Sequence, residues 1–143
     1  DPIPDMILNS DFFAVRNSLL LIDNPVLYPA WFLHAKKENK TIREIRNVAF
    51  SYWLKNEHVI EYLLPNLIIT LVVKSNLEVE KAIPYMNSDY SEYLVKALAD
   101  EYSEEKWNWM KKLTGIHELT YKLDAAVNRK DSFYQHIIAE KNK

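Results

Sequence analysis

The chain of 143 residues contains a single glycine, Gly115, and no cysteine. Glycine supplies the positive backbone angles that tight hairpin turns and bulges require, so its scarcity argues against a strand-rich fold. The lack of cysteine excludes a disulfide framework, a thiolate metal site and a cysteine nucleophile. A glycine-rich phosphate loop is excluded as well. The sequence therefore predicts helices joined by short polar links, with the helix before Gly115 ending in a left-handed cap.

The chain also lacks a strong charge of either sign. Its 18 basic and 20 acidic residues give a formal net charge of −2. This balance provides no whole-chain attraction to nucleic acid or to an anionic membrane, so we expect neither as a partner. A hydrophobic content of 48% is enough for one continuous core, and the absence of cysteine fits a reducing compartment. We therefore expect a single helical domain over residues 1–143 and a cytoplasmic location.

Apolar residues recur at spacings of three and four along most of the chain, which is the pattern of amphipathic helices. The fold class predicted from this pattern is all-α, as a single multi-helix bundle of about seven to nine helices around a buried central helix. The expected helices cover approximately residues 5–22, 29–37, 42–55, 59–73, 76–86, 88–101, 104–114 and 116–128, followed by a last helix capped by Asp131.

The expected central helix, residues 59–73, is apolar around nearly its whole circumference. A helix of this kind is usually buried. Its length falls short of the roughly 20 residues that a membrane-spanning helix needs. Pro65 interrupts the run, and because proline fits best in the first turn of a helix, the break is expected at Leu64.

Acidic residues near the core suggest a metal site. In the expected helix over residues 88–101, Glu101 lies on the same face as Tyr90, Tyr93 and Leu94. Glu104 follows closely and can project from the same side, although an acidic residue after the Ser103 cap also stabilises a helix start through the dipole. Of the four histidines, none is paired at i, i+4, and His58 with nearby Glu61 offers one more carboxylate-imidazole pair. Glu101, Glu104 and His58 are therefore the candidate metal ligands, with ordinary surface ion pairs as the alternative.

Trp107 and Trp109 are two residues apart, so they point in roughly opposite directions around a helix. Both cannot enter one core, and exposed aromatic side chains are favoured anchors of interfaces. Both are candidate interface residues, for a protein partner or a second copy of the chain. The basic residues Lys36, Lys37, Lys40, Arg43 and Arg46 alternate with Glu38 and Glu44, which is more typical of a solvated surface than of a phosphate-binding track.

Two stretches carry a family resemblance. Residues 24–53 read NPVLYPAWFLHAKKENKTIREIRNVAFSYW, in which a helix near a proline is followed by a polar link, a threonine cap and an aromatic-rich helix. Residues 98–116 read LADEYSEEKWNWMKKLTGI, an acidic helix that ends in a tryptophan-containing turn. Over residues 11–116 the chain resembles the first half of the heme-oxygenase-like superfamily, the group of TenA- and PqqC-type enzymes and non-heme di-iron oxidases.

The resemblance implies that Glu101 is the first metal-binding glutamate, with iron or manganese as the metal. The histidine that usually follows this glutamate is absent, and Glu104 or Glu105 stands near its place. The function implied is that of a diverged or partial metal-dependent oxidase or oxygenase acting on a small molecule. The alternative is a non-catalytic helical module that binds a protein or an apolar ligand, and the sequence identifies no catalytic or cofactor-binding residue.

Overall fold

The computed structural model describes residues 3–18, 25–120, 123 and 129–141. Contacts divide the chain into two compact units. We call Ile3–Ser88 the N-terminal unit and residues 1–2 with 89–143 the C-terminal unit. A single domain over residues 1–143 stays a prediction.

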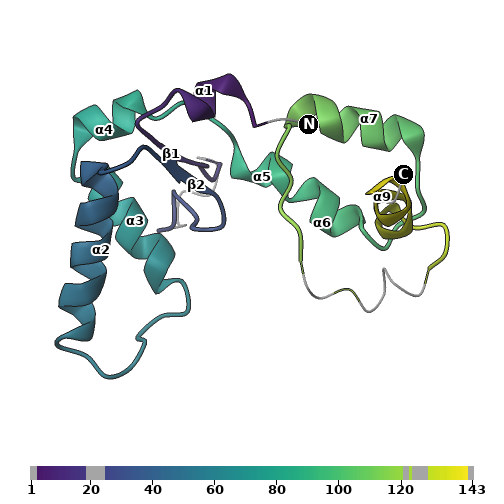
Figure 1. The fold of residues 1–143 in the computed structure, drawn as a ribbon. Helices are drawn as coiled ribbons and strands as arrows, with labels where there is room; N and C mark the ends of the chain where they lie inside the picture. The colour runs from purple at the N-terminus through teal and green to yellow at the C-terminus, as the bar shows by residue number, and fades with distance from the viewer. Residues whose placement is uncertain (1–2, 19–24, 121–122, 124–128, 142–143) are drawn as a thin grey trace. The chain divides into compact units, whose positions relative to one another are not determined.

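The N-terminal unit combines helices with a small sheet (Figure 1). Strands β1 and β2 pair in antiparallel fashion, with Phe12 opposite Ala35 and Ala14 opposite Leu33. Helix α2 packs against α3, and α3 packs against α4. The elements of this unit are α1 (Asp5–Leu8), β1 (Phe12–Ala14), β2 (Leu33–Ala35), α2 (Lys40–Trp53), α3 (Leu64–Lys74) and α4 (Leu77–Ala82).

The all-α prediction is wrong, because the described chain is a helix-rich mixture of helices and a two-stranded sheet. The expected helix over residues 5–22 ends at Leu8, and the expected helix over 29–37 is replaced by β2. Residues 12–15 are all buried, as in a strand covered on both faces. A short apolar run of this kind cannot be distinguished from a buried helix by its periodicity. The other apolar residues assigned to the first helix, Leu19 and Ile22, lie outside the described residues.

The core of the N-terminal unit forms where α3 meets the sheet. Phe12 and Ala14 of β1 pack with Tyr28, Ile69 and Val73. Helix α3 begins at Leu64 with a proline in its first turn, as the sequence predicts. Residues 59–63, which precede α3, are exposed and not helical, although the sequence predicts a buried helix there.

The idea of a bundle around a buried helix over residues 59–73 is therefore wrong. Val59 and Ile60 are exposed by 54% and 76%, and Leu71 on α3 itself by 59%. Within the described ranges, no helix combines the length and apolar character needed to cross a bilayer.

Two polar side chains of α3 hold the segment that leads into β2. The Thr70 hydroxyl oxygen accepts hydrogen bonds from the backbone N–H groups of Leu27 and Tyr28, both at 3.1 Å. One turn earlier, the Asn66 side-chain oxygen accepts a hydrogen bond from the Ala30 N–H at 3.0 Å. Because this segment has no regular structure, these bonds replace the backbone partners that a helix or sheet would supply. They fix the path of the chain across α3.

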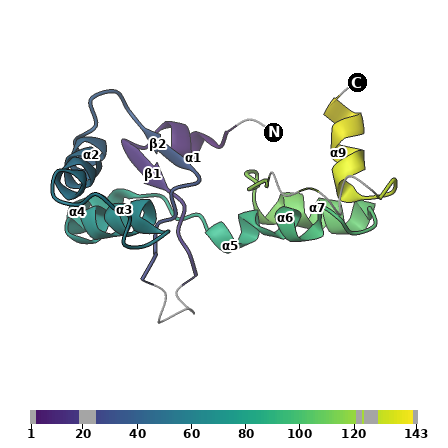
Figure 2. The ribbon, with the colours of Figure 1, turned by 90° about the horizontal axis from the view of Figure 1, so that it is seen from below.

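The C-terminal unit is built from short helices (Figures 1 and 2). Leu94, Ala97 and Leu98 from the region of α6 pack with Met110 of α7 and Phe133 of α9. Helix α5 starts at Ser88, the last residue of the N-terminal unit, and the rest of it belongs here. The helices are α5 (Ser88–Ser91), α6 (Tyr93–Ala97), α7 (Glu104–Leu113) and α9 (Phe133–Lys141).

The helix caps follow the sequence in part. The side chains of Asn39, Asn76 and Ser103 cap α2, α4 and α7, as expected from their residue types. The last helix is capped by Ser132, whose hydroxyl accepts from the Gln135 N–H, and not by Asp131. No described residue supports a left-handed cap at Gly115, because α7 ends in extended backbone at the preceding threonine. The helix expected from residue 116 is not formed over residues 116–120.

Candidate functional site

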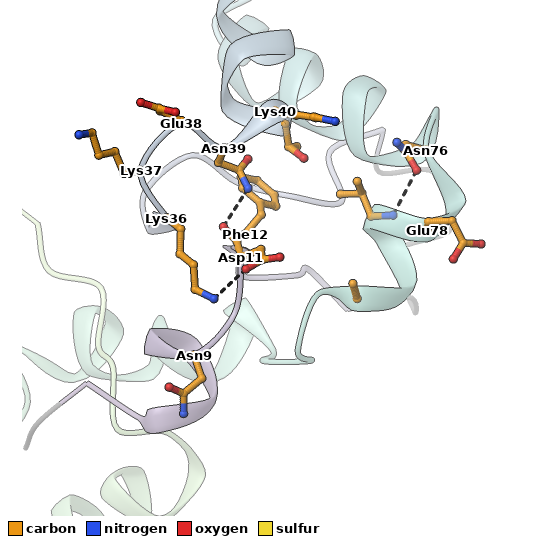
Figure 3. Close-up of a pocket in the computed structure, with 13 residues that line it drawn as sticks. Asn9, Asp11, Phe12, Lys36, Lys37, Glu38, Asn39, Lys40, Asn76 and Glu78 are labelled. Carbon is orange, nitrogen blue, oxygen red and sulfur yellow. Dashed lines mark hydrogen bonds and ion pairs between the residues drawn. The ribbon is translucent and has the colours of Figure 1, made fainter.

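A pocket of about 780 Å³ with several charged residues in its lining lies in the N-terminal unit, and we call it the lysine pocket (Figure 3). One wall is the chain that enters β1, including Asp11 and Phe12. The second wall is the link from β2 into α2, residues 36–41, and the third is the start of α4. Three lysines and three acidic residues contribute to the lining: Lys36, Lys37, Lys40, Asp11, Glu38 and Glu78.

Some lining residues build the pocket. The Asn39 side chain accepts a hydrogen bond from the Ile42 N–H and donates one to the Asp11 carbonyl oxygen, at 3.1 and 2.9 Å. It thereby joins the first turn of α2 to the chain that enters β1. The Lys36 ammonium donates to the Asp11 carboxylate at 2.7 Å. Figure 3 shows both contacts side by side.

The ion pair between Lys36 and Asp11 also fixes a charge state. The ammonium donates a hydrogen bond to the carboxylate and attracts its charge, and together these effects hold the pKa of Asp11 below its ordinary value. A lowered pKa in the folded state means that the pair supports the fold at neutral pH and is lost as the pH falls through that pKa. Both side chains are more than half exposed, so the pair orients Lys36 more than it stabilises the protein.

Other lining side chains remain available for a ligand. Those of Asn9, Lys37 and Lys40 make no hydrogen bond or ion pair within the described part of the chain. Lys37 points away from Asp11 in Figure 3. Lys40 is the first residue of α2, where the helix dipole repels a positive charge. A lysine at this position therefore brings no stabilisation through the helix dipole.

The backbone of the pocket is strained at Glu38. This residue has a φ of 62°, in the left-handed region that residues other than glycine and asparagine rarely adopt. Its carbonyl oxygen accepts a hydrogen bond from Arg43 at 3.1 Å, which helps to hold the turn in place. Strained residues of this kind gather at ligand-binding sites, where the surrounding structure holds them. The link between β2 and α2 thus holds a backbone conformation that costs free energy, of order 1–3 kcal/mol.

The lining offers both hydrogen-bond donors and acceptors. Lysine ammonium groups and asparagine N–H groups donate, and carboxylate and amide oxygens accept. Its volume lies in the range of small-molecule pockets, about 300–1,000 Å³. The charges of the lining lysines and acids balance one another. A lining of this type suits a ligand rich in hydroxyl groups, each of which both donates and accepts.

The residues predicted as metal ligands have other partners. The Glu101 carboxylate is 73% exposed and pairs with Arg129 at 3.2 Å. Glu104 accepts a hydrogen bond from the Tyr102 hydroxyl, and this bond lowers the pKa of Glu104. Burial and the same hydrogen bond raise the pKa of Tyr102 to about 12. Both carboxylates thus make surface contacts with neighbouring side chains, in line with the alternative to metal binding that the sequence left open.

His58 lies in the exposed link between α2 and α3, where its carbonyl oxygen accepts a hydrogen bond from Tyr52. Across the described ranges, no group of three or more histidine, aspartate or glutamate side chains is placed to hold a metal ion. The interpretation of the chain as a metal-binding oxidoreductase is therefore not supported. Glu101 does not lie against the core, because the expected helix over 88–101 is interrupted after Ser91 and again after Ala97. The two ends of that segment therefore do not share one helix face.

Trp107 and Trp109 lie on different sides of α7, as their spacing indicates. Trp107 packs against the C-terminal core and lies 5.6 Å from the His117 ring. Burial lowers the pKa of that histidine. Trp109 is 46% exposed, and its ring centroid is 5.1 Å from that of Tyr93. A role of either tryptophan in an interface stays a prediction.

A second hollow, of about 570 Å³, lies between α2 and α3. Its lining is mainly apolar and includes Trp53, Tyr62 and Ile68. Few of these side chains can form hydrogen bonds, so the hollow does not suit a hydroxyl-rich ligand. The lysine pocket is therefore the stronger candidate for a polar substrate.

The fold is a helix-rich mixture of helices and a two-stranded sheet, and the lysine pocket is a candidate site with a lining of mixed charge. The model of one protein family matches residues 1–137, and its description is capsular polysaccharide synthesis protein. Because the match covers nearly the whole chain, the protein belongs to this family. The comparisons with curated proteins and with solved structures gave no match.

The family corrects the resemblance drawn from the sequence. The chain is not a member of the heme-oxygenase-like superfamily, and the oxidase or oxygenase function inferred from it is wrong. The alternative of a non-catalytic helical interaction module gains no support from the family either. Lys36, Lys37 and Lys40 are exposed, as the interpretation of this stretch as a solvated surface predicts. The sequence did not indicate that they also line a pocket with Asp11 and α4. The positive first turn of α2 is the one signal in the sequence that could have drawn attention to it.

Proposed function

We propose that this protein takes part in capsular polysaccharide synthesis by binding a saccharide substrate in the lysine pocket. The observation that carries the proposal is the family match over residues 1–137. The proposal keeps the expectation of a small-molecule substrate and of a cytoplasmic location. It contains no metal-dependent oxidation step.

The chemistry of the pocket supports a saccharide. Sugar hydroxyl groups donate and accept hydrogen bonds, and the pocket presents ammonium, amide and carboxylate groups within one volume. Phe12 and Val79 add apolar lining, against which the C–H groups of a sugar ring can pack. Lys37 and Lys40 are the groups most available for the ligand, because neither is used by the fold in the described residues. They also provide positive charge for any phosphate or carboxylate that the saccharide carries.

Binding is tested with oligosaccharides and monosaccharides released from the capsule of the source strain by partial hydrolysis. Titration into the 143-residue chain, followed by amide chemical shifts, should move the signals of residues 36–41 and 76–79. The double substitution Lys37→Gln with Lys40→Gln should weaken the binding of monosaccharides at least fivefold. A fivefold loss corresponds to about 1 kcal/mol. This is less than the roughly 1.5–3 kcal/mol that one fully formed hydrogen bond to a charged group contributes.

The matched control is Lys55→Gln, which removes the charge of an exposed lysine that does not line the pocket. This change should leave the affinity as in the unaltered chain. Neither pocket substitution should destabilise the protein, because Lys40→Gln removes an unfavourable charge at the start of α2. Equal affinities of the double variant and the Lys55→Gln control would refute the pocket assignment. Shifts elsewhere in the chain, with none at residues 36–41, would refute it too.

A further inference from the structure

Arg16, which follows β1, carries a mostly buried positive charge that the fold leaves incompletely paired. Its side chain is 25% exposed, and its Nε atom is buried with no hydrogen-bond partner in the part of the chain that the structure describes. The Arg16 guanidinium comes within ion-pair range of one described carboxylate, that of Glu80, with 4.0 Å between Nη2 and Oε1. This distance is too long for a hydrogen bond. A group with several N–H donors is therefore placed without a matching acceptor.

The carboxylate of Glu80 is already matched by a second cation. The Lys74 ammonium, at the end of α3, lies 2.9 and 3.0 Å from the two carboxylate oxygens of Glu80 on α4. The Tyr28 hydroxyl also approaches this carboxylate, at 3.5 Å. Two cations thus share one carboxylate, and because Lys74 makes the shorter contacts, the unmatched charge lies on Arg16. A buried charge without full pairing costs free energy, which a further negative group would offset.

The surrounding chain holds Arg16 in place. Its backbone N–H donates to the Met86 carbonyl oxygen at 2.9 Å, and its carbonyl oxygen accepts from the Ser88 N–H at 2.8 Å. The guanidinium carbon lies 5.9 Å from the centroid of the Tyr28 ring, and that ring is itself almost fully buried. The position of the guanidinium is therefore set by the fold before any ligand binds, which lowers the entropy lost on binding.

We propose that Arg16 and Lys74 form a binding site for a phosphate group. A guanidinium matches the oxygens of phosphate with parallel N–H···O bonds, and a lysine ammonium adds a point charge. Phosphate has enough acceptor oxygens to contact both cations at once, whereas a carboxylate has two. Its negative charge also balances the net positive charge of Arg16, Lys74 and Glu80 taken together.

The test is a titration of potassium phosphate into the 143-residue chain at constant pH and ionic strength, with the Arg16 Nε–H signal observed by NMR. This signal should move and saturate, because the buried donor gains an acceptor. Arg16→Gln should weaken phosphate binding about fivefold or more, measured from the amide shifts of residues 86–88. The matched control is Arg46→Gln, since Arg46 is an exposed arginine of α2 whose guanidinium donates to the Asn47 side chain. This variant should bind phosphate as the unaltered chain does.

A second variant separates phosphate binding from a purely structural role of Arg16 as a partner of Glu80. Glu80→Gln removes a negative charge beside the site and keeps an oxygen that Lys74 can contact. It should tighten phosphate binding about threefold, because a repulsive charge is gone. Weaker binding by Glu80→Gln would overturn the inference. So would an Arg16 signal that phosphate leaves unmoved, or one that moves no more than the Arg46 signal does. These results do not depend on whether Arg16→Gln folds.

The inference does not rest on the proposed function, because Arg16, Lys74 and Glu80 are not among the residues that line the lysine pocket. The double variant Lys37→Gln with Lys40→Gln should therefore keep the Arg16 response to phosphate, and its loss would overturn the separate site. Titration with glucose 1-phosphate and with glucose identifies the source of the phosphate group. A response to glucose 1-phosphate that glucose does not produce supports a site for a phosphate carried by a larger molecule. A response to inorganic phosphate alone supports a site for the free anion.

Discussion

Replacement of Thr70 by valine should lower the free energy of unfolding of the N-terminal unit by about 2–4 kcal/mol. Valine has nearly the shape of threonine but no hydroxyl oxygen. The backbone N–H groups of Leu27 and Tyr28 would both lose their acceptor. Tyr28 is 1% exposed, so water cannot replace the missing partner at that amide. Each buried donor left without an acceptor costs about 1–3 kcal/mol.

The measurement is hydrogen exchange of the Tyr28 amide, together with urea unfolding followed by circular dichroism. Faster exchange at Tyr28 and a lower urea midpoint are expected for Thr70→Val. The control Thr70→Ser keeps the oxygen and removes one methyl group, so it should cost only about 1 kcal/mol. If the valine variant were more stable than the serine variant, the hydroxyl would not hold this segment.

Replacement of Phe133 by alanine should destabilise the C-terminal unit by about 3–5 kcal/mol. The Phe133 side chain is completely buried and packs with Leu94, Leu98 and Met110. The Tyr102 ring meets it edge to face, with 5.2 Å between centroids. Its removal leaves a cavity in the centre of this core. The free energy of unfolding from urea titration measures the loss.

Phe50→Ala is the matched control, because it deletes the same side chain at a position that is 61% exposed. A change of about 0.5 kcal/mol or less is expected there. Similar losses for the two variants would contradict the assignment of Phe133 to a core.

The longer helices could be predicted from the sequence because their periodicity and caps agree. The helix expected over residues 42–55 appears as α2, with Asn39 as its cap. Ser103 likewise predicts the start of α7, and Pro65 the start of α3. In each case a local hydrogen bond or a proline fixes the helix start, independently of distant contacts.

The strands could not be predicted, because their formation depends on residues far apart in the chain. Phe12 pairs with Ala35, and an apolar run such as residues 12–15 is compatible with either a buried helix or a buried strand. The scarcity of glycine favoured helices throughout, but the described strands are not joined by a tight hairpin that would need it. A long connection between β1 and β2 removes that requirement.

The candidate site could not be predicted from the sequence either. The lysine pocket joins side chains from β1, from the link before α2 and from the start of α4, and no local spacing relates these segments. The apolar helix face expected over Tyr90, Tyr93 and Leu94 is not formed as predicted, since the two tyrosines are exposed by 39% and 37% while Leu94 is exposed by 3%. Only the opposed directions of Trp107 and Trp109 followed from spacing alone.

The central claim, that the protein serves capsular polysaccharide synthesis through the lysine pocket, is tested most directly by capsule formation in the source strain. The gene is deleted and then restored in its original, Lys37→Gln with Lys40→Gln, or Lys55→Gln form. We expect deletion to reduce cell-bound capsular polysaccharide, the original and Lys55→Gln forms to restore it, and the pocket variant to fail although it accumulates to the same level. Full restoration by the pocket variant, or an unchanged capsule after deletion, would contradict the claim.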